Sequence, residues 1–178
     1  ITTGYYKKPE ATAPAIDKDG WFHTGDAGYL KGNHLYLTER IKDLFKTSNG
    51  KYISPQALET KLSIDRYIDQ IAVIADQRKF VSALIVPVYG LVKNYAKEKG
   101  LEYKDMADLL QHPKVQALFR ARIDTLQQQF AHYEQVKRFT LLSEPFSMER
   151  GELTNTLKLK RSVVAKNYKE LIDKMYEE

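Results

Sequence analysis

Three polar stretches of this 178-residue chain carry side chains that a hydrophobic core does not need. The first ends in the tight turn Thr24-Gly25-Asp26. A carboxylate held on such a turn can accept hydrogen bonds from the two neighbouring hydroxyls of a ribose. The simpler interpretation is that Thr-Gly-Asp is only a turn, so this segment alone does not establish a nucleotide site.

The second polar stretch, residues 39–51, mixes both charges and contains the turn signal Ser48-Asn49-Gly50. A mixed charge run is usually a solvated face, and its position after a hairpin suits a linker or hinge. Lys51 follows Gly50, but the G-x-x-x-x-G-K-[ST] pattern of a Walker phosphate loop is absent. This stretch therefore favours a hinge and does not support a phosphate loop of that kind.

The third polar stretch, residues 152–161, brings Lys158, Lys160 and Arg161 to the start of a predicted helix. It is either a basic helix start without a further role or a means of bringing a cation to an anion. A lysine ammonium on its long stem can reach a negative charge that develops during a reaction.

Composition excludes several classes of site. The chain has no cysteine, which excludes disulfides and thiolate chemistry, and its four histidines show no spacing typical of metal ligands. A net charge of +5 can favour nucleic acid, phospholipid or nucleotide phosphates. No apolar run is long enough to span a membrane, and no signal peptide is recognisable. The first residue is Ile1, which suggests a fragment of a longer protein.

The hydrophobic pattern predicts an α+β fold, a small sheet with helices packed on it. A hairpin is expected over 28–38, and a helix is expected to open at Ser54-Pro55. Residues 68–75 and 80–88 should pair as antiparallel strands, with a third strand at 137–142. Helices are expected at 91–99, 113–130 and 161–176, and the segment 145–156 is expected to be irregular and exposed.

Taken in order, the polar stretches resemble the acyl-adenylate-forming superfamily, which includes acyl-CoA synthetases, luciferases and the adenylation domains of peptide synthetases. The similar segments are GYYKKPEAT at 4–12, GWFHTGD at 20–26, RIKD at 40–43, KTSNGKYISP at 46–55 and LTNTLKLKR at 153–161. The last segment is similar to the long-chain fatty-acid–CoA ligase branch. The resemblance covers nearly the whole chain.

The resemblance implies a role for particular residues. Asp26 and Arg40 would bind the nucleotide, and Lys42 would be the hinge residue. Lys158 would be the lysine that assists adenylation, although Leu157 stands where the family usually has glycine, and Lys160 lies close enough to compete for the role. A loop near the pantetheine of CoA would consist of Ser48, Asn49, Gly50 and Lys51, with Asn49 in place of a usual glycine.

The same resemblance implies a division of the chain. Residues 1–41 would be the tail of a large AMP-binding domain, and residues 42–178 a mobile lid. The substrates would be ATP, a fatty acid and CoA, with AMP as a product. The phosphate loop, the acyl pocket and the Mg²⁺ ligands would lie in the rest of the large domain, which would also be the partner of the lid. We therefore expect this chain alone to be inactive.

Two alternatives remain open from the sequence. One is another acyl- or aryl-adenylate-forming ligase, or an enzyme that passes acyl-AMP to a carrier protein. The other is a basic nucleic-acid-binding module, which the charge and the twelve tyrosines would suit. No recognised nucleic-acid motif supports it, so we expect no nucleic-acid partner. The ligase interpretation also predicts a cytoplasmic location, with peripheral membrane contact as a further option because fatty acids partition into bilayers.

Overall fold

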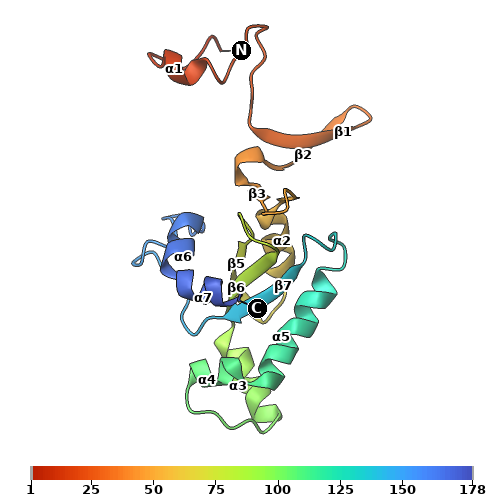
Figure 1. The fold of residues 1–178 in the computed structure, drawn as a ribbon, viewed down its shortest axis with the longest axis vertical. Helices are drawn as coiled ribbons and strands as arrows, with labels where there is room; N and C mark the ends of the chain where they lie inside the picture. Colours follow the sequence, from red (N-terminus) through yellow and green to blue (C-terminus); the bar gives the residue numbers. More distant parts are fainter. Residues whose placement is uncertain (1, 178) are drawn as a thin grey trace. The chain divides into compact units, whose positions relative to one another are not determined.

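The computed structural model describes residues 2–177, apart from the side chain of residue 39. The chain divides into two compact units, Ile1–Leu44 and Phe45–Glu178 (Figure 1).

The first unit is built on a β-hairpin. Strands β1 (Asp26–Lys31) and β2 (His34–Arg40) pair antiparallel, and Lys31 lies opposite His34, which leaves a two-residue loop. Gly32 opens that loop with φ +61°, as such short hairpin turns require. The predicted hairpin at 28–38 is confirmed and is slightly longer. A single helical turn, α1 (Pro9–Thr12), precedes it, and a 3-10 turn, η1 (Ile41–Asp43), follows.

The described residues of the first unit include no buried hydrophobic side chain. Every hydrophobic residue counted as buried in the described chain belongs to the second unit. On the hairpin, Leu30 is 74% exposed and Leu37 is 67% exposed. Apolar side chains this exposed on both strands of a hairpin are typical of a surface that another part of a protein covers.

The second unit is built around a three-stranded sheet with the order β5-β6-β7. Strands β5 (Ile68–Ile74) and β6 (Val81–Pro87) are antiparallel, as the sequence predicted. Strand β7 (Val136–Leu141) is the predicted third strand and runs parallel to β6. A parallel neighbour requires a long crossover. The crossover consists of α3 (Tyr89–Glu98), α4 (Met106–Gln111) and α5 (Pro113–Leu126).

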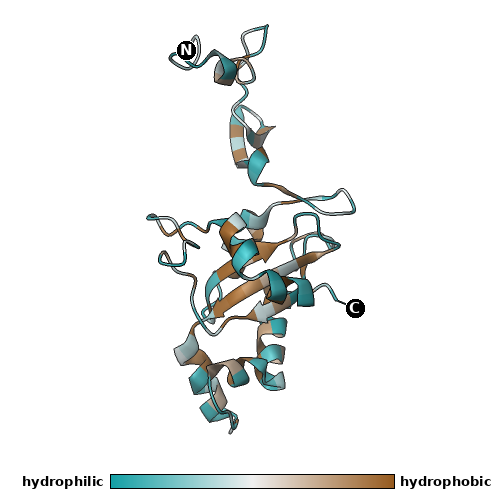
Figure 2. Ribbon diagram, turned by 60° about the vertical axis from the view of Figure 1, so that its left-hand side comes forward, coloured by the Kyte–Doolittle hydropathy of each residue, from teal (hydrophilic) through white to brown (hydrophobic). Residues whose placement is uncertain are grey.

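Strand β6 is buried on both faces, so helices cover the sheet on two sides. Ala83 and Ile85 face a core shared with α3, α5 and helix α2 (Pro55–Leu62), whereas Leu84 and Val86 face a second core. Alternate residues of a strand point to opposite faces, which produces this division. The second core is completed by α6 (Arg161–Asn167) and α7 (Lys169–Lys174). Figure 2 shows hydrophobic residues concentrated along the strands of this sheet, while the helices around it carry both hydrophilic and hydrophobic residues. The predicted α+β class is confirmed.

Several predicted boundaries were imprecise. The expected helix at 161–176 divides at Tyr168 into α6 and α7, and the expected helix at 113–130 ends at Leu126. Gln127 caps the C-terminal end of α5, and its side-chain Oε1 accepts a hydrogen bond from the Val136 amide at 2.8 Å, which ties the helix end to β7. Helix α4 and the two-residue pair β3 (Phe45–Lys46) and β4 (Tyr52–Ile53) were not predicted.

One expectation was wrong in an important respect. The segment 145–156 is irregular but not exposed throughout, because Phe146 is 2% and Glu152 is 1% exposed. Phe146 packs into the second core, and its ring meets Tyr168 edge-on with centroids 5.6 Å apart. A segment rich in polar residues can be buried in this way only when its polar groups find partners.

Candidate active site

The hairpin brings together the two residues that the sequence analysis assigned to the nucleotide. Asp26 begins β1 and lies opposite Arg40, the last residue of β2, and Arg40 Nε is 3.4 Å from Asp26 Oδ1. The Asp26 amide donates to Thr24 Oγ1 at 3.1 Å, which fixes the turn before the strand. The Asp26 side chain is 30% exposed and that of Arg40 is 75% exposed. Both therefore remain accessible to a polar ligand.

Lys42, the predicted hinge residue, lies in the single 3-10 turn η1 and is exposed. The boundary between the two compact units falls two residues later, after Leu44. Short irregular segments between packed units are where backbone rotation is usually absorbed. The hinge role of Lys42 remains a prediction.

The predicted CoA-proximal loop is a closed turn between β3 and β4. The Thr47 amide donates to the Lys51 carbonyl at 2.9 Å, and the Lys51 amide donates back to Thr47 Oγ1 at 3.1 Å. Gly50 has φ +75°, and a Cβ added there would meet no atom within 4 Å. Gly50 is therefore required for its backbone angle and not for space.

This loop is also attached to the turn between β5 and β6. The Ser48 amide donates to the Arg78 carbonyl at 3.0 Å, and Asn49 Nδ2 donates to the Lys79 carbonyl at 3.4 Å. Asn49 replaces a usual glycine of the family without a positive φ, so the replacement adds no backbone strain. Lys51 Nζ lies 5.5 Å from the centroid of the exposed Tyr133 ring.

Lys158 lies on a small loop, residues 153–160 (the Lys158 loop), whose backbone is closed by its own hydrogen bonds. The Thr154 amide donates to the Lys158 carbonyl at 2.8 Å, and the Lys158 amide donates to Thr154 Oγ1 at 3.0 Å. Leu153 and Leu159 form an isolated β-bridge below the loop. Leu157 has φ +60°, a conformation that glycine adopts without cost. The structure thus shows why a glycine would suit the position before Lys158.

The three cations of this segment have different surroundings. Lys158 and Lys160 are exposed, and within residues 2–177 neither ammonium has a hydrogen-bond or ion-pair partner. Arg161 is held by Glu59, with Nη1 to Oε1 and Nη2 to Oε2 both at 2.6 Å. Arg161 is therefore a structural residue, and Lys158 and Lys160 are the cations available to a ligand.

Sequence analysis did not single out the carboxylates that support this loop. Glu59 lies on α2, 102 positions from Arg161. Glu152 is close in sequence to Lys158 but lies in a segment that was expected to be exposed. No local pattern could have identified Glu59, because its partner comes from a distant helix.

A cleft of about 330 Å³ lies beside the loop in the second unit. Its walls are mainly apolar and include Phe45 of β3, Val73 of β5, Val164 of α6, and Leu159 of the segment before α6. Arg161 lies at this cleft with its guanidinium 5.5 Å from the Phe45 ring centroid. Leu159, near the end of the Lys158 loop, and Arg161, just after it, therefore line the same cleft as Phe45 of β3, the strand that leads into the Ser48–Lys51 turn.

The described part of the chain offers neither a metal site nor a membrane-spanning helix. No three side chains of His, Asp or Glu gather there as a metal site would need. Among the described helices, none has both the length and the apolar character needed to cross a bilayer.

The comparisons with known proteins agree on one family. The family model "AMP-binding enzyme C-terminal domain" matches residues 42–178. The chain is 36% identical over 184 residues to the peroxisomal long chain acyl-CoA synthetase 6 of Arabidopsis thaliana, and 33% identical over 180 residues to the human long-chain-fatty-acid–CoA ligase 1. These alignments cover 100% and 99% of this chain but only 26% of each relative. The chain thus spans about a quarter of the length of these relatives.

Solved structures show the same fold. The adenylation domain of a carboxylate reductase from Mycobacterium chelonae matches 98% of this chain and 26% of its own length, with a TM-score of 0.75 and 27% identity. A corresponding domain from Segniliparus rugosus, solved in complex with AMP and a co-purified carboxylic acid, matches with a TM-score of 0.75 and 26% identity. Together with the match over residues 42–178, these similarities show that the chain belongs to the AMP-binding enzyme C-terminal domain family and corresponds to the C-terminal part of an acyl-CoA synthetase.

Proposed function

We propose that this chain is the lid, with a short tail of the large domain, of an ATP-dependent long-chain fatty-acid–CoA ligase. In the first step a fatty-acid carboxylate attacks the α-phosphorus of ATP, giving acyl-AMP and pyrophosphate. In the second step the CoA thiol attacks the acyl carbon, giving acyl-CoA, AMP and a proton. Residues 1–41 belong to the large domain in this proposal, and residues 42–178 form the lid that turns about Lys42 between the two steps.

One observation carries the proposal most directly. Lys158 is an exposed cation with no partner among the described side chains, and it extends from a loop that is closed and supported on both sides. A preorganised cation of this kind can stabilise negative charge that builds up on the carboxylate and the α-phosphate. Asp26 and Arg40 are proposed to hold the ribose hydroxyls of the nucleotide, and the turn with Ser48 and Gly50 is proposed to approach the pantetheine.

The remaining parts of the reaction are assigned to residues outside this chain. Mg²⁺ accompanies ATP and is proposed to be held by the large domain. The fatty-acid pocket is assigned there as well. We further propose a cytoplasmic enzyme that meets membranes peripherally, because its acid substrate partitions into bilayers. This chain alone is expected to make no acyl-CoA.

A second candidate is favoured by the solved structures. The reductase adenylation domains share the fold at a TM-score of 0.75, and one was solved with an attached PCP domain. An enzyme of this kind would pass the acyl group of acyl-AMP to a thiol on a carrier domain instead of free CoA. The first step and the proposed role of Lys158 are the same in both candidates, so only the thiol acceptor distinguishes them.

The test is an assay of the longer protein with ATP, Mg²⁺ and carboxylic acids of different lengths. Pyrophosphate release with palmitate, together with palmitoyl-CoA when CoA is added, is the expected result. Pyrophosphate release without any CoA product, but with acylation of a phosphopantetheinylated carrier, would favour the second candidate. Absence of pyrophosphate release with fatty, short-chain and aryl acids alike would reject both.

A further inference from the structure

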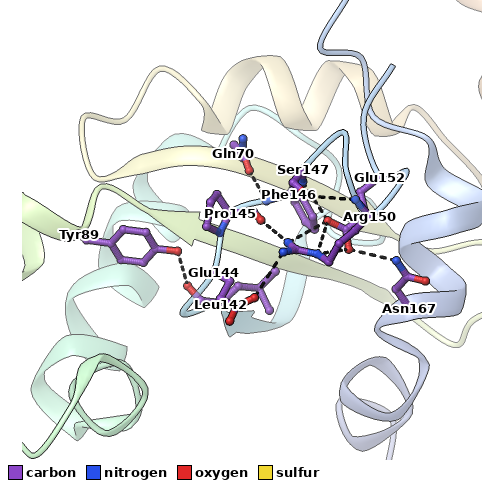
Figure 3. A network of polar contacts seen from close by, with 10 residues as sticks. All are labelled: Gln70, Tyr89, Leu142, Glu144, Pro145, Phe146, Ser147, Arg150, Glu152 and Asn167. Atoms are coloured by element: carbon purple, nitrogen blue, oxygen red, sulfur yellow. Dashed lines mark hydrogen bonds and ion pairs between the residues drawn. The ribbon is translucent and has the colours of Figure 1, made fainter. Parts of the chain in front are cut away.

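The most deeply buried carboxylate among the described residues takes no part in the proposed reaction steps. Glu152 is 1% exposed. Its oxygens receive hydrogen bonds from Arg150 Nε at 3.1 and 3.2 Å, from the Ser147 amide at 3.0 Å and from Asn167 Nδ2 at 3.1 Å (Figure 3). Burial alone would raise the pKa of Glu152, but the hydrogen bonds from Arg150, Asn167 and Ser147 outweigh it and lower the pKa. The side chain is therefore a charged and fully satisfied group.

Arg150 extends this network away from Glu152. Its guanidinium also contacts the Pro145 carbonyl and lies 3.4 Å from Glu144 Oε2. The amide of Phe146, the residue after Pro145, donates to Gln70 Oε1 at 2.7 Å (Figure 3). This hydrogen bond anchors the 145–152 segment to β5. The segment before the Lys158 loop is therefore fixed to the sheet by side chains as well as by the burial of Phe146.

The backbone of Glu152 forms the base of the Lys158 loop. The Lys160 amide donates to the Glu152 carbonyl at 2.7 Å, and the bridge between Leu153 and Leu159 follows directly. The Glu152 side chain reaches Asn167 on α6, the helix that begins immediately after the loop. One residue thus joins the segment before the loop, the segment after it and the following helix.

The other end of the loop is fixed independently. Arg161, the first residue of α6, forms the two-bond pair with Glu59, and Glu59 Oε1 also accepts the Val73 amide at 2.8 Å. Both flanks of the loop are therefore tied to the sheet, while Lys158 at its tip is exposed. Leu157, next to Lys158, is held at φ +60° by this closed backbone.

We propose that Glu152 is a positioning residue for Lys158: it holds the 153–160 loop in the one backbone arrangement that aims the lysine for adenylation. The inference rests on the proposed function for its catalytic part and on the geometry of this chain for its structural part. Glu152 does not touch the substrates in this proposal and acts through the loop. A displacement of a catalytic group by about 1 Å can lower a rate about 100-fold, so a loss of this anchor should be visible in the adenylation step.

A purely structural role is the competing explanation, and the chain offers a matched control. Asp65 also has a buried side chain, 7% exposed, and it is bound by Arg122 Nε at 2.7 and 2.8 Å and by the Tyr67 amide at 2.8 Å. This pair connects the segment after α2 to α5, and among the described residues neither side chain forms a hydrogen bond or ion pair with the Lys158 loop. Asp65→Asn should therefore destabilise the fold without displacing the lysine.

The first arm of the test measures amide hydrogen exchange by NMR in this 178-residue chain. Glu152→Gln should speed exchange at the Leu157, Lys158 and Lys160 amides at least tenfold beyond any change at the core amides of β6. Asp65→Asn should change the loop amides no more than the core. Asn167→Ala removes only the link to α6 and should give a smaller increase in exchange at the same three amides. This variant also tests the proposal if Glu152→Gln does not fold. Unchanged loop exchange in both Glu152→Gln and Asn167→Ala would overturn the proposal.

The second arm measures the two half-reactions in the longer enzyme. Glu152→Gln should lower kcat for acyl-AMP formation 10- to 100-fold with little change in KM for ATP, while conversion of supplied acyl-AMP to acyl-CoA stays within about twofold of wild type. Equal losses in both half-reactions, matching those of Asp65→Asn, would overturn the positioning role. If wild type forms no acyl-AMP at all, the proposed function fails, and the exchange measurements still decide whether Glu152 orders the loop.

Discussion

The guanidinium of Arg161 meets the carboxylate of Glu59 through two parallel contacts of 2.6 Å each, which joins the first residue of α6 to the middle of α2. Glu59 at the same time satisfies the backbone amide of Val73 on the edge strand β5. A two-bond arginine–carboxylate pair fixes orientation as well as distance. This contact decides where α6, and with it the end of the Lys158 loop, lies on the sheet.

Breaking this pair should destabilise the second unit. The two side chains are 26% and 17% exposed, so Arg161→Met should lower the free energy of unfolding by about 2–3 kcal/mol, somewhat less than for a fully buried pair. Urea unfolding of this chain measures it. As a control, Asp173→Asn removes the more exposed pair with Arg78 and should cost less than about 1 kcal/mol. Equal costs for the two variants would contradict the structural importance of Arg161.

Lys158→Ala in the longer enzyme should abolish most acyl-AMP formation because the charge that stabilises the developing anion is lost. Removal of one such group typically costs about 100- to 1,000-fold in kcat. Conversion of supplied acyl-AMP to acyl-CoA should persist. The matched control is Lys160→Ala, which removes a neighbouring exposed cation of the same kind. If Lys160→Ala loses adenylation and Lys158→Ala does not, the assignment of the lysine is wrong.

Leu157→Gly should leave the fold intact and relieve the backbone strain at φ +60°. A non-glycine residue in this region costs about 1–2 kcal/mol, which is partly offset by the greater freedom of glycine in the unfolded chain. Because Leu157 is 67% exposed, little apolar burial is lost. We expect a change between zero and about +1 kcal/mol in unfolding free energy. Gly50→Ala, which introduces such strain, should instead destabilise by about 1–2 kcal/mol. A marked destabilisation by Leu157→Gly would show that Leu157 contributes packing.

Removal of residues 1–44 should leave a folded second unit. All hydrophobic residues counted as buried in the described chain lie beyond Leu44, so the deletion removes no part of the core. The 45–178 fragment should unfold cooperatively at the same thermal midpoint as the whole chain, as followed by circular dichroism. The separate 1–44 peptide should show no cooperative transition. A large fall in the midpoint for 45–178 would show that the first unit stabilises the second.

Acid should destabilise the chain partly through Glu152. The folded-state pKa of Glu152 lies below its ordinary value of 4.5, so its ionised form stabilises the fold above that pH, and this contribution disappears as the pH falls from about 4.5 through the folded-state pKa. Wild type should therefore lose stability more steeply than Glu152→Gln as the pH falls below 4.5. Urea unfolding at intervals from pH 6 to 3 measures both slopes. Parallel curves would mean that Glu152 is not charged in the folded chain.

The sequence alone was sufficient to predict the order of the main helices and strands and the family. Apolar periodicity located β5, β6 and the helix opened by Ser54-Pro55, because these signals depend on neighbouring residues only. The resemblance of the polar segments to the adenylate-forming family placed Asp26 and Arg40 among the nucleotide-binding candidates. The hairpin register puts these two residues opposite each other. The elements that sequence analysis missed, such as α4 and the short pair β3–β4, are too short for periodicity to identify.

Only the tertiary structure decided which charged side chains are paired or buried, because packing brings together elements that are far apart in the sequence. Lys158, Lys160 and Arg161 look alike in sequence, yet Arg161 is bound by Glu59 from 102 positions away and the two lysines are exposed. Likewise, the segment around Glu152 appeared polar enough to be exposed, but Phe146 draws it into the second core and its partners satisfy the buried charge. Burial and ion pairing depend on which elements pack together, and a local pattern of residues does not contain that information.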